Sequence, residues 1–272
     1  MASPTEINVQ QLSRLIGTPE CPVIVDDRTD EDFDADPRLI PGAFRHPHTD
    51  MVALGKRLSG QRVVVSCQAG LKLSEGAAAI LRAEGAHAEN LVGGHEAWRA
   101  ANLPALDVSK LPPPDDQGRT VWVTRQRPKV DRIACPWLIR RFIDPNAMFL
   151  FVTAGQVEAV ADRFGAAPFD IDGVFWSHRG DRCTFDTLIE EFGLGSGALD
   201  HLATIVRGAD TNRHDLAPQC AGLLAASLGL SRMYRDDLAQ LEAGMALYDA
   251  FYRWARDATD EGHDWPSQPA KA

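Results

Sequence analysis

The chain has 272 residues, of which 44% are hydrophobic and 24% charged, and its formal net charge is −10. These are the values of a globular protein long enough for two domains, so a disordered chain is excluded. The acidic balance argues against nucleic acid as a partner. No apolar run approaches membrane-spanning length and the first residues do not resemble a signal peptide, so we expect no membrane partner.

The chain carries five cysteines that are widely scattered. They are Cys21, Cys67, Cys135, Cys183 and Cys220. An odd number without regular spacing argues against a disulfide framework and for a reducing compartment. We therefore expect a cytoplasmic protein.

The first hundred residues alternate predicted helices and strands. The helices are expected at 6–16, 50–58 and 72–84, and the strands at 22–25, 62–66 and 88–92. Thr5 is expected to cap the first helix, and residues 26–42 to form an acid- and proline-rich loop. This alternation predicts an α/β domain, a parallel sheet flanked by helices, whose ligands bind at the carboxyl ends of the strands.

A proline-rich linker at 109–118 is expected to separate a first domain, residues 1–108, from a second, residues 119–260. Residues 261–272 are expected to form a flexible tail. The second domain reads as mainly α-helical with a few short strands. Its strands are expected at 121–124 and 148–152, and its helices at 131–142, 156–164, 184–192, 199–208, 217–229 and 235–258.

The last predicted helix carries apolar residues at a 3-4-3-4-3 spacing. They are Leu238, Leu241, Met245, Tyr248, Tyr252 and Ala255. Such a stripe predicts one core-facing side of a helix, and the alternative is a helix-pairing seam of a homodimer.

The predicted strand at 62–66 runs directly into Cys67, and a short loop then leads to the helix that begins near Lys72. A thiol at such a turn lies near free backbone N–H groups and the positive end of a helix, which stabilise a thiolate. Lys72 adds a cation. The pattern is typical of an accessible sulfur nucleophile, and the alternative is a buried structural cysteine after a run of valines.

Segments on either side of this loop complete a recognisable pattern. They are residues 23–28, 40–43, 93–98 and 102–104. In this order and spacing, residues 5–106 resemble a rhodanese (sulfurtransferase) domain. The resemblance implies that Cys67 takes a sulfane sulfur from a donor as a persulfide and passes it to a thiol acceptor, without a cofactor. We expect the anionic donor to be bound by a loop with Arg28 at its mouth. The loop residues are Gln68, Ala69, Gly70, Leu71 and Lys72.

Two positions of the loop bear on its chemistry. Many active rhodaneses carry arginine at the fifth position after the cysteine, where this chain has Lys72. Lysine supplies charge but not the bidentate fork that matches a sulfonate, so thiosulfate and other sulfane donors stay open. Related phosphatases close a longer loop with arginine at the sixth position, which is Leu73 here, so a phosphatase is excluded.

Three segments of the second domain form another recognisable pattern, namely residues 122–142, 177–186 and 207–211. With these segments, residues 121–257 resemble the C-terminal domain of chromate-resistance proteins of the B type. The resemblance implies a role in the response to chromate, as a sensor-regulator or a detoxification factor. Longer members of that family have a different N-terminal region, and a rhodanese domain in its place argues against a DNA-binding regulator.

Basic residues are concentrated at 119–141, where Asp131 is the single acid. Guanidinium groups match tetrahedral oxyanions such as chromate or sulfate. The candidates for an oxyanion site are Arg125, Lys129, Arg132, Arg179 and Arg182. The alternative is that these side chains form structural ion pairs with nearby acids.

A metal site in the second domain is a weaker hypothesis. Its first candidates are His178, Asp181 and Cys183, with Asp131 and Cys135 as further ones. The spacing is not a zinc signature, and no Cys-x-x-Cys pair accompanies it. Three functions therefore stay open: a sulfurtransferase, a chromate or oxyanion sensor with the rhodanese as a docking module, and a thiol-dependent chromate reductase that uses Cys67 with Cys135 or Cys183.

Overall fold

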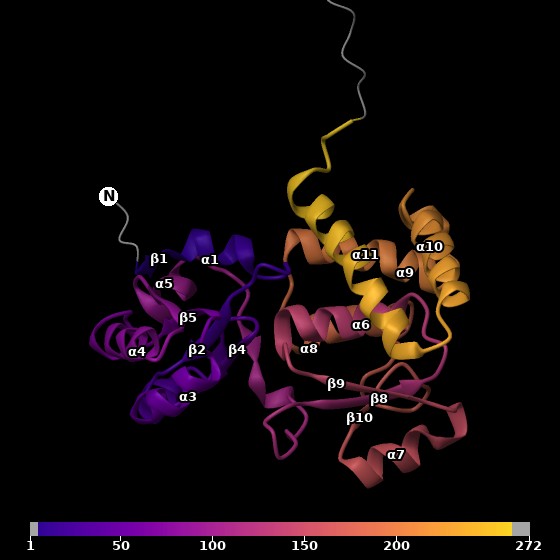
Figure 1. The fold of residues 1–272 in the computed structure, drawn as a ribbon. Coiled ribbons are helices and arrows are strands. Elements are labelled where there is room, and N and C mark those ends of the chain that lie inside the picture. Colours follow the sequence, from indigo (N-terminus) through magenta and orange to yellow (C-terminus); the bar gives the residue numbers. More distant parts are fainter. Residues whose placement is uncertain (1–4, 263–272) are drawn as a thin grey trace, which may run out of the picture.

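The computed structural model describes residues 5–262, and its first half is built on a five-stranded parallel sheet in the order β1-β6-β5-β2-β4 (Figure 1). The strands are β1 (Glu6–Ile7), β2 (Val23–Asp26), β4 (Ala43–Arg45), β5 (Arg62–Ser66) and β6 (His87–Leu91). The helices are α1 (Val9–Leu15), α2 (Asp30–Ala35), α3 (Met51–Arg57), α4 (Lys72–Ala83) and α5 (Gly94–Ala100). Because every pairing is parallel, the carboxyl ends of β2, β5 and β6 meet at one edge.

The two faces of this sheet are buried by different helices. Val25, Val63 and Val65 pack under α3 and α4. Ile24 and Val64 point the other way, into the cluster that contains Leu12 of α1 and Trp98 of α5. Successive residues of a strand alternate between faces, which explains this division. The predicted α/β domain is confirmed.

Two local predictions in this half were wrong. Thr5 does not cap the first helix, because Asn8 does so in a capping box with Gln11, and each side chain accepts the other's backbone N–H. The segment 26–42 is not only loop, since Thr29 caps the short helix α2. It also contains β3 (Arg38–Leu39), which pairs antiparallel with β7 (Leu106–Asp107).

The second half is a three-stranded parallel sheet with many helices around it. The strands, in the order β10-β8-β9, are β8 (Val121–Arg125), β9 (Met148–Val152) and β10 (Ala167–Pro168). The helices are α6 (Asp131–Leu138), α7 (Val157–Phe164), α8 (Thr184–Glu191), α9 (Gly197–Asp210), α10 (Cys220–Met233) and α11 (Asp237–Asp257). Helix α7 covers one face of the sheet, and α6 and α8 cover the other (Figure 1). A mainly helical domain with a few short strands is thereby confirmed.

The predicted helix at 131–142 changes form along its length. It is α-helical to Leu138 and continues as a wider π-helical turn over Ile139–Ile143. Pro136 lies in the second turn and cannot donate a backbone hydrogen bond there. The wider turn keeps Ile139 and Phe142 in the core.

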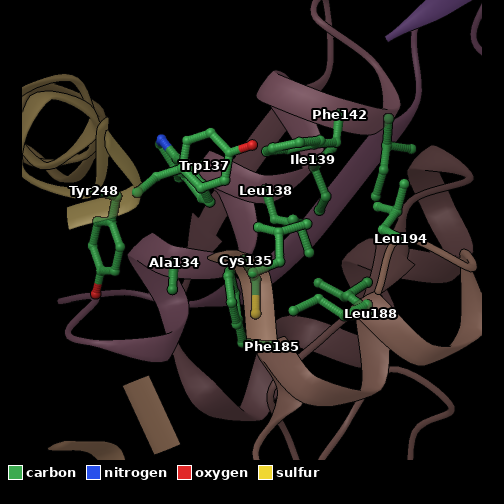
Figure 2. Packing of buried hydrophobic residues seen from close by; sticks show 14 of the residues in the cluster. Ala134, Cys135, Trp137, Leu138, Ile139, Phe142, Phe185, Leu188, Leu194 and Tyr248 are labelled. Atoms are coloured by element: carbon green, nitrogen blue, oxygen red, sulfur yellow. The ribbon is translucent and has the colours of Figure 1, made fainter. Parts of the chain in front are cut away.

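The core of the second half is aromatic (Figure 2). Trp137 lies at its centre, with the rings of Phe185 and Tyr248 at centroid distances of 6.3 and 6.2 Å. Tyr248 comes from the predicted apolar stripe of the last helix. Leu241, Met245 and Tyr252 of the same stripe are also buried, which confirms the prediction that this side of the helix faces the core. Leu238, at the start of the helix, is 48% exposed.

The two halves share one continuous buried cluster rather than being held apart by the linker. The amide of Gly42 donates to the carbonyl of Phe142 at 2.7 Å. The amide of Asp107 donates to the carbonyl of Phe192 at 3.1 Å. The division into residues 1–108, 109–118 and 119–260 stays a proposal, and the tail predicted at 261–272 falls almost wholly outside the described residues.

Candidate functional site

Cys67 lies where β5 ends, at the carboxyl edge of the first sheet. Its Sγ atom is 3.0 Å from the Oγ atom of Ser74, in the first turn of α4. The residue is only 4% exposed, so the thiol lies beneath its loop and is less accessible than the sequence analysis expected. The exposed neighbours are Leu71 and Lys72.

The carbonyl groups of Cys67 and Gln68 face the start of α5. The amide of His95 donates to the carbonyl of Cys67 at 2.9 Å, and the amide of Glu96 to that of Gln68 at 3.0 Å. Glycine is required at Gly70, where φ is +67° and a Cβ atom would lie 2.3 Å from the carbonyl oxygen of Leu91.

The backbone N–H groups of the same loop are unpaired in the described part of the chain. Within residues 5–262, the backbone N–H groups of residues 68–72 have no protein acceptor. Consecutive unpaired N–H groups at the start of a helix form a concave anion site. Lys72 adds an exposed ammonium group that forms no ion pair with any described carboxylate. The arrangement suits a small anion above Cys67.

Asp27 is a residue of this site that the sequence analysis did not single out. In the parallel register of β2 and β5, Asp26 lies opposite Ser66, and the amide of Asp27 donates to the Ser66 carbonyl at 3.0 Å. The next residues, Asp27 and Cys67, therefore lie opposite each other. Strand alternation puts both side chains on the face covered by α4. Both carboxyl oxygens of Asp27 are buried without a hydrogen-bond partner among the described residues.

This burial changes the acidity of Asp27. Loss of hydration, and then the charge of the adjacent Asp26, raise the pKa of the Asp27 carboxyl to about 7. A carboxyl group beside the thiol is therefore protonated for part of the neutral pH range. The signal in the sequence was a second acid directly after a buried strand, and local pattern does not say which way its side chain points.

Arg28 does not lie at the mouth of the anion loop, which corrects the prediction. Its side chain is buried, and Nε donates to both carboxylate oxygens of Asp26. Its two other nitrogens donate to the carbonyls of Asp36 and Arg38. These bonds occupy the guanidinium group and brace the segment after β2, so Arg28 has a structural role.

The five cations expected to form one oxyanion site do not all come together. Arg125 and Arg132 both lie near Asp170, at 3.9 and 3.1 Å. Arg179 pairs with Glu191 and Arg182 with Glu190. The Nζ atom of Lys129 contacts the carbonyl of Arg127 at 3.5 Å. The ion-pair alternative therefore describes four of the five side chains.

The expected metal trio also separates. The side chain of Asp181 is 81% exposed and lies 3.6 Å from Arg213. The thiol of Cys183 is buried and donates to Asp186. His178 instead faces Asp131, Asp170 and Asp210, with its Nε2 atom 3.6, 3.3 and 3.3 Å from their carboxylates. Asp170 was missed because it follows an unpredicted two-residue strand, and Asp210 because nothing local connects it with His178.

Two known protein families match this chain, one in each half of the fold. Residues 8–101 match the family described as rhodanese-like domain, and residues 122–255 match the family described as ChrB, C-terminal domain. The chain joins a rhodanese-like domain to a ChrB C-terminal domain. Both resemblances stated from the sequence are confirmed.

A curated relative covers the ChrB domain. Protein ChrB of Cupriavidus metallidurans is 39% identical over 155 residues, which are 56% of this chain and 44% of that protein. The match thus spans less than half the length of that relative. Two solved structures match the rhodanese-like domain. A rhodanese-like domain protein from Staphylococcus aureus is 26% identical, with a TM-score of 0.31, over 35% of this chain and 90% of that one. A Staphylococcus saprophyticus protein is 26% identical, with the same TM-score, over 34% and 91%.

The remaining cysteines of the ChrB domain are poor partners for Cys67. Cys135 and Cys183 are fully buried, and burial raises the pKa of both thiols well above the ordinary value. Cys135 donates to Asp131 at 3.4 Å and is a core residue (Figure 2). These environments argue against a reductase that uses either thiol. In residues 5–262, no helix has the length and apolar character to cross a membrane.

Proposed function

We propose that this protein is a sulfurtransferase in which Cys67 carries sulfur as a persulfide. The observation that supports this best is the run of unpaired N–H groups of residues 68–72 around a cysteine at the carboxyl edge of a parallel sheet. A nucleophile at this place meets its anionic substrate where the backbone supplies donors and where no carboxylate of residues 5–262 pairs with Lys72.

The proposed first step displaces a leaving anion from the donor. With thiosulfate, the Cys67 thiolate attacks the outer sulfur atom, the sulfur–sulfur bond of the donor breaks, and its electron pair leaves with sulfite. The charge of the departing sulfite falls within reach of the loop N–H groups, which stabilise it. In the second step an acceptor thiolate attacks the outer sulfur of the persulfide, and Cys67 leaves as the thiolate. No redox cofactor enters this balance.

Ser74 and Asp27 flank the sulfur in this scheme. The Ser74 hydroxyl can donate to the thiolate at the observed 3.0 Å. Asp27, in its protonated form, adds no negative charge beside an incoming dianion, whereas the ionised form repels it. We assign the reaction to a reducing compartment, the cytoplasm, because all five cysteines are free thiols.

We further propose that the ChrB domain links this activity to chromate or oxyanion resistance. The support is the family to which residues 122–255 belong and the cluster shared by the two domains. A shared core makes the two domains act as one unit rather than as independently tethered modules.

The intact mass of the full-length protein after exposure to thiosulfate tests the sulfurtransferase. We expect the wild type to gain one sulfur atom and Cys67→Ser to gain none. Cys21→Ser is the matched control. Cys21 lies outside the site and is the one cysteine that is only partly buried, so this variant should behave as the wild type. The gain should disappear when an excess of a small thiol is added as the acceptor.

An equal gain by Cys67→Ser would contradict the proposal, as would no gain by the wild type with either thiosulfate or 3-mercaptopyruvate. The second result would favour the alternative function, a chromate-binding sensor in which the rhodanese-like domain is a docking module. Calorimetric titration of chromate and of sulfate into the full-length protein would then be the deciding measurement.

A further inference from the structure

Four side chains from separate segments of the ChrB domain meet at one point. Asp131 is the first residue of α6, Asp170 follows β10, His178 lies in the turn before α8, and Asp210 ends α9. The Nε2 atom of His178 is within 3.6 Å of a carboxylate oxygen of each aspartate. One ligand atom from each of Asp131, Asp170 and His178 lies within 4.8 Å of the others.

Hydrogen bonding alone does not account for this convergence. A ring nitrogen carries at most one hydrogen and donates it to one acceptor, yet three carboxylates share Nε2. Asp131 is completely buried, where unbalanced negative charge is costly. Arg132 pairs with Asp170, but among the described residues Asp131 and Asp210 have His178 as their only cationic partner.

Contacts other than His178 hold the two most buried carboxylates in position. Asp131 accepts hydrogen bonds from the amides of Thr184, at 2.7 Å, and Phe185, at 3.1 Å. Asp170 accepts from the hydroxyl of Thr184 and pairs with Arg132. The carboxylates of Asp131 and Asp170 are therefore held in place by the start of α8 and by neighbouring side chains, as the ligands of a bound ion are.

The spacing of the ligand atoms fits a transition metal. A metal about 2.1 Å from each of its tetrahedral ligands holds neighbouring ligand atoms about 3.4 Å apart. The His178 nitrogen lies 3.6 and 3.3 Å from the oxygens of Asp131 and Asp170. We propose that Asp131, Asp170 and His178 bind a divalent first-row transition metal such as Zn²⁺ or Mn²⁺, with Asp210 beside them as a further carboxylate.

A second observation concerns β8, the strand that lies beside the chain leading to Asp170. The hydroxyl of Thr124 is completely buried and has no hydrogen-bond partner among residues 5–262. Strand alternation puts Thr124 on the same face of β8 as Trp122, toward α6, and the chain beyond Pro168 passes beside it to Asp170. The strand next to the cluster therefore holds a buried hydroxyl that is unpaired among the described residues. The side chain of His178 is 39% exposed, so an ion can reach the cluster from solvent.

The alternative is a metal-free cluster. In that case the imidazole of His178 is protonated, and its Nε2–H faces the carboxylates of Asp131, Asp170 and Asp210 as an ion pair. The two readings make opposite predictions about ion binding. An imidazolium cannot coordinate a metal, so a metal must displace its proton, and metal binding should release protons.

Binding is tested on the tag-free full-length protein after treatment with a chelator. Equilibrium dialysis and calorimetry with Zn²⁺ alone and with Mn²⁺ alone should show one ion per chain. Mg²⁺ should bind far more weakly, because imidazole suits transition metals better. Zn²⁺ should also raise the midpoint of thermal unfolding, since it binds the folded state.

Variants locate the site. His178→Ala and His178→Gln should each weaken binding by about 100-fold or more and abolish the thermal shift. Glutamine keeps the size of the side chain without the imidazole, and circular dichroism shows whether each variant is folded. His214→Ala, which removes an exposed histidine near the end of α9, should bind as the wild type does. No saturable binding by the wild type, or equal binding by the His178 and His214 variants, would overturn the proposal.

Discussion

The Sγ atom of Cys67 and the Oγ atom of Ser74 lie 3.0 Å apart beneath the anion loop. The same hydroxyl lies 3.3 Å from the carbonyl oxygen of Leu71. A hydroxyl has one hydrogen, so it can donate either to the Leu71 carbonyl or to the sulfur. A thiol can donate to Ser74, whereas a thiolate needs Ser74 as its donor. Ionisation of Cys67 therefore reorients this hydroxyl.

Ser74→Ala should slow persulfide formation about tenfold, because the thiolate loses one hydrogen bond worth about 1.4 kcal/mol. The fold should persist, since only one buried hydroxyl is removed. Intact-mass time courses with thiosulfate measure the rate, and urea denaturation measures stability. Ser74→Thr keeps a hydroxyl group at this position, so it serves as the conservative comparison and should retain more of the rate. An unchanged rate in Ser74→Ala would show that the hydroxyl does not support the thiolate.

Lys72 should affect the binding of an anionic donor more than the chemical step. We expect Lys72→Ala to raise KM for thiosulfate about tenfold with little change in kcat, because the exposed ammonium attracts the donor before and after the reaction alike. Lys72→Arg should lower KM, since a guanidinium group binds oxyanions with two parallel hydrogen bonds. Lys56→Ala, an exposed lysine on α3, is the control. A loss of kcat at unchanged KM in Lys72→Ala would contradict this assignment.

The buried Asp27 should make the protein less stable as the pH rises. Its pKa is about 7 in the folded protein and 3.8 in its ordinary state, so between these values the folded state holds one more proton than the unfolded state. The free energy of unfolding therefore falls with rising pH across this window. Asp27→Asn should flatten the fall and exceed the wild type at pH 8 by about 2 kcal/mol.

Urea denaturation of the two proteins at pH 5 and pH 8 measures this effect. The exposed Asp34→Asn on α2 is the matched control and should follow the wild type. Parallel pH dependences for the wild type and Asp27→Asn would show that Asp27 does not carry the buried proton.

Gly17 should be essential for the packing of the two domains. A Cβ atom there would lie 2.4 Å from Phe142 and 2.6 Å from Tyr252, and φ is +79°. Gly17→Ala should cost about 3 kcal/mol, from the positive φ together with overpacking of the aromatic rings. Gly60→Ala is a close control, because φ is +77° there and nothing lies within 4 Å of the added atom. It should cost only about 1 kcal/mol.

The difference between the two glycine variants in urea denaturation isolates the contact between the domains. Equal losses of stability would mean that the loop at Gly17 does not pack against Phe142 and Tyr252 in solution.

Local pattern was sufficient for the elements that position Cys67. The strand predicted at 62–66 coincides with β5, and the helix predicted from 72 begins at Lys72. A run of β-branched residues followed by a loop and a helical stripe depends on neighbours in the chain, so the sequence states it directly. The sequence also showed that Asp26, Asp27 and Arg28 follow the strand predicted at 22–25. It did not show which of these side chains points toward the thiol of Cys67.

By itself, the sequence determined the order of strands and helices, the place of Cys67 and the apolar stripe of α11. Only the tertiary structure decided that Arg28 braces a loop, that Asp27 lies beside Cys67, and that Arg179 and Arg182 pair with glutamates. It also decided that His178 meets Asp131, Asp170 and Asp210 from segments up to 79 residues apart. Periodicity arises from contacts within one element, whereas these sites arise where elements distant in the chain pack together, and that packing is set by the whole core.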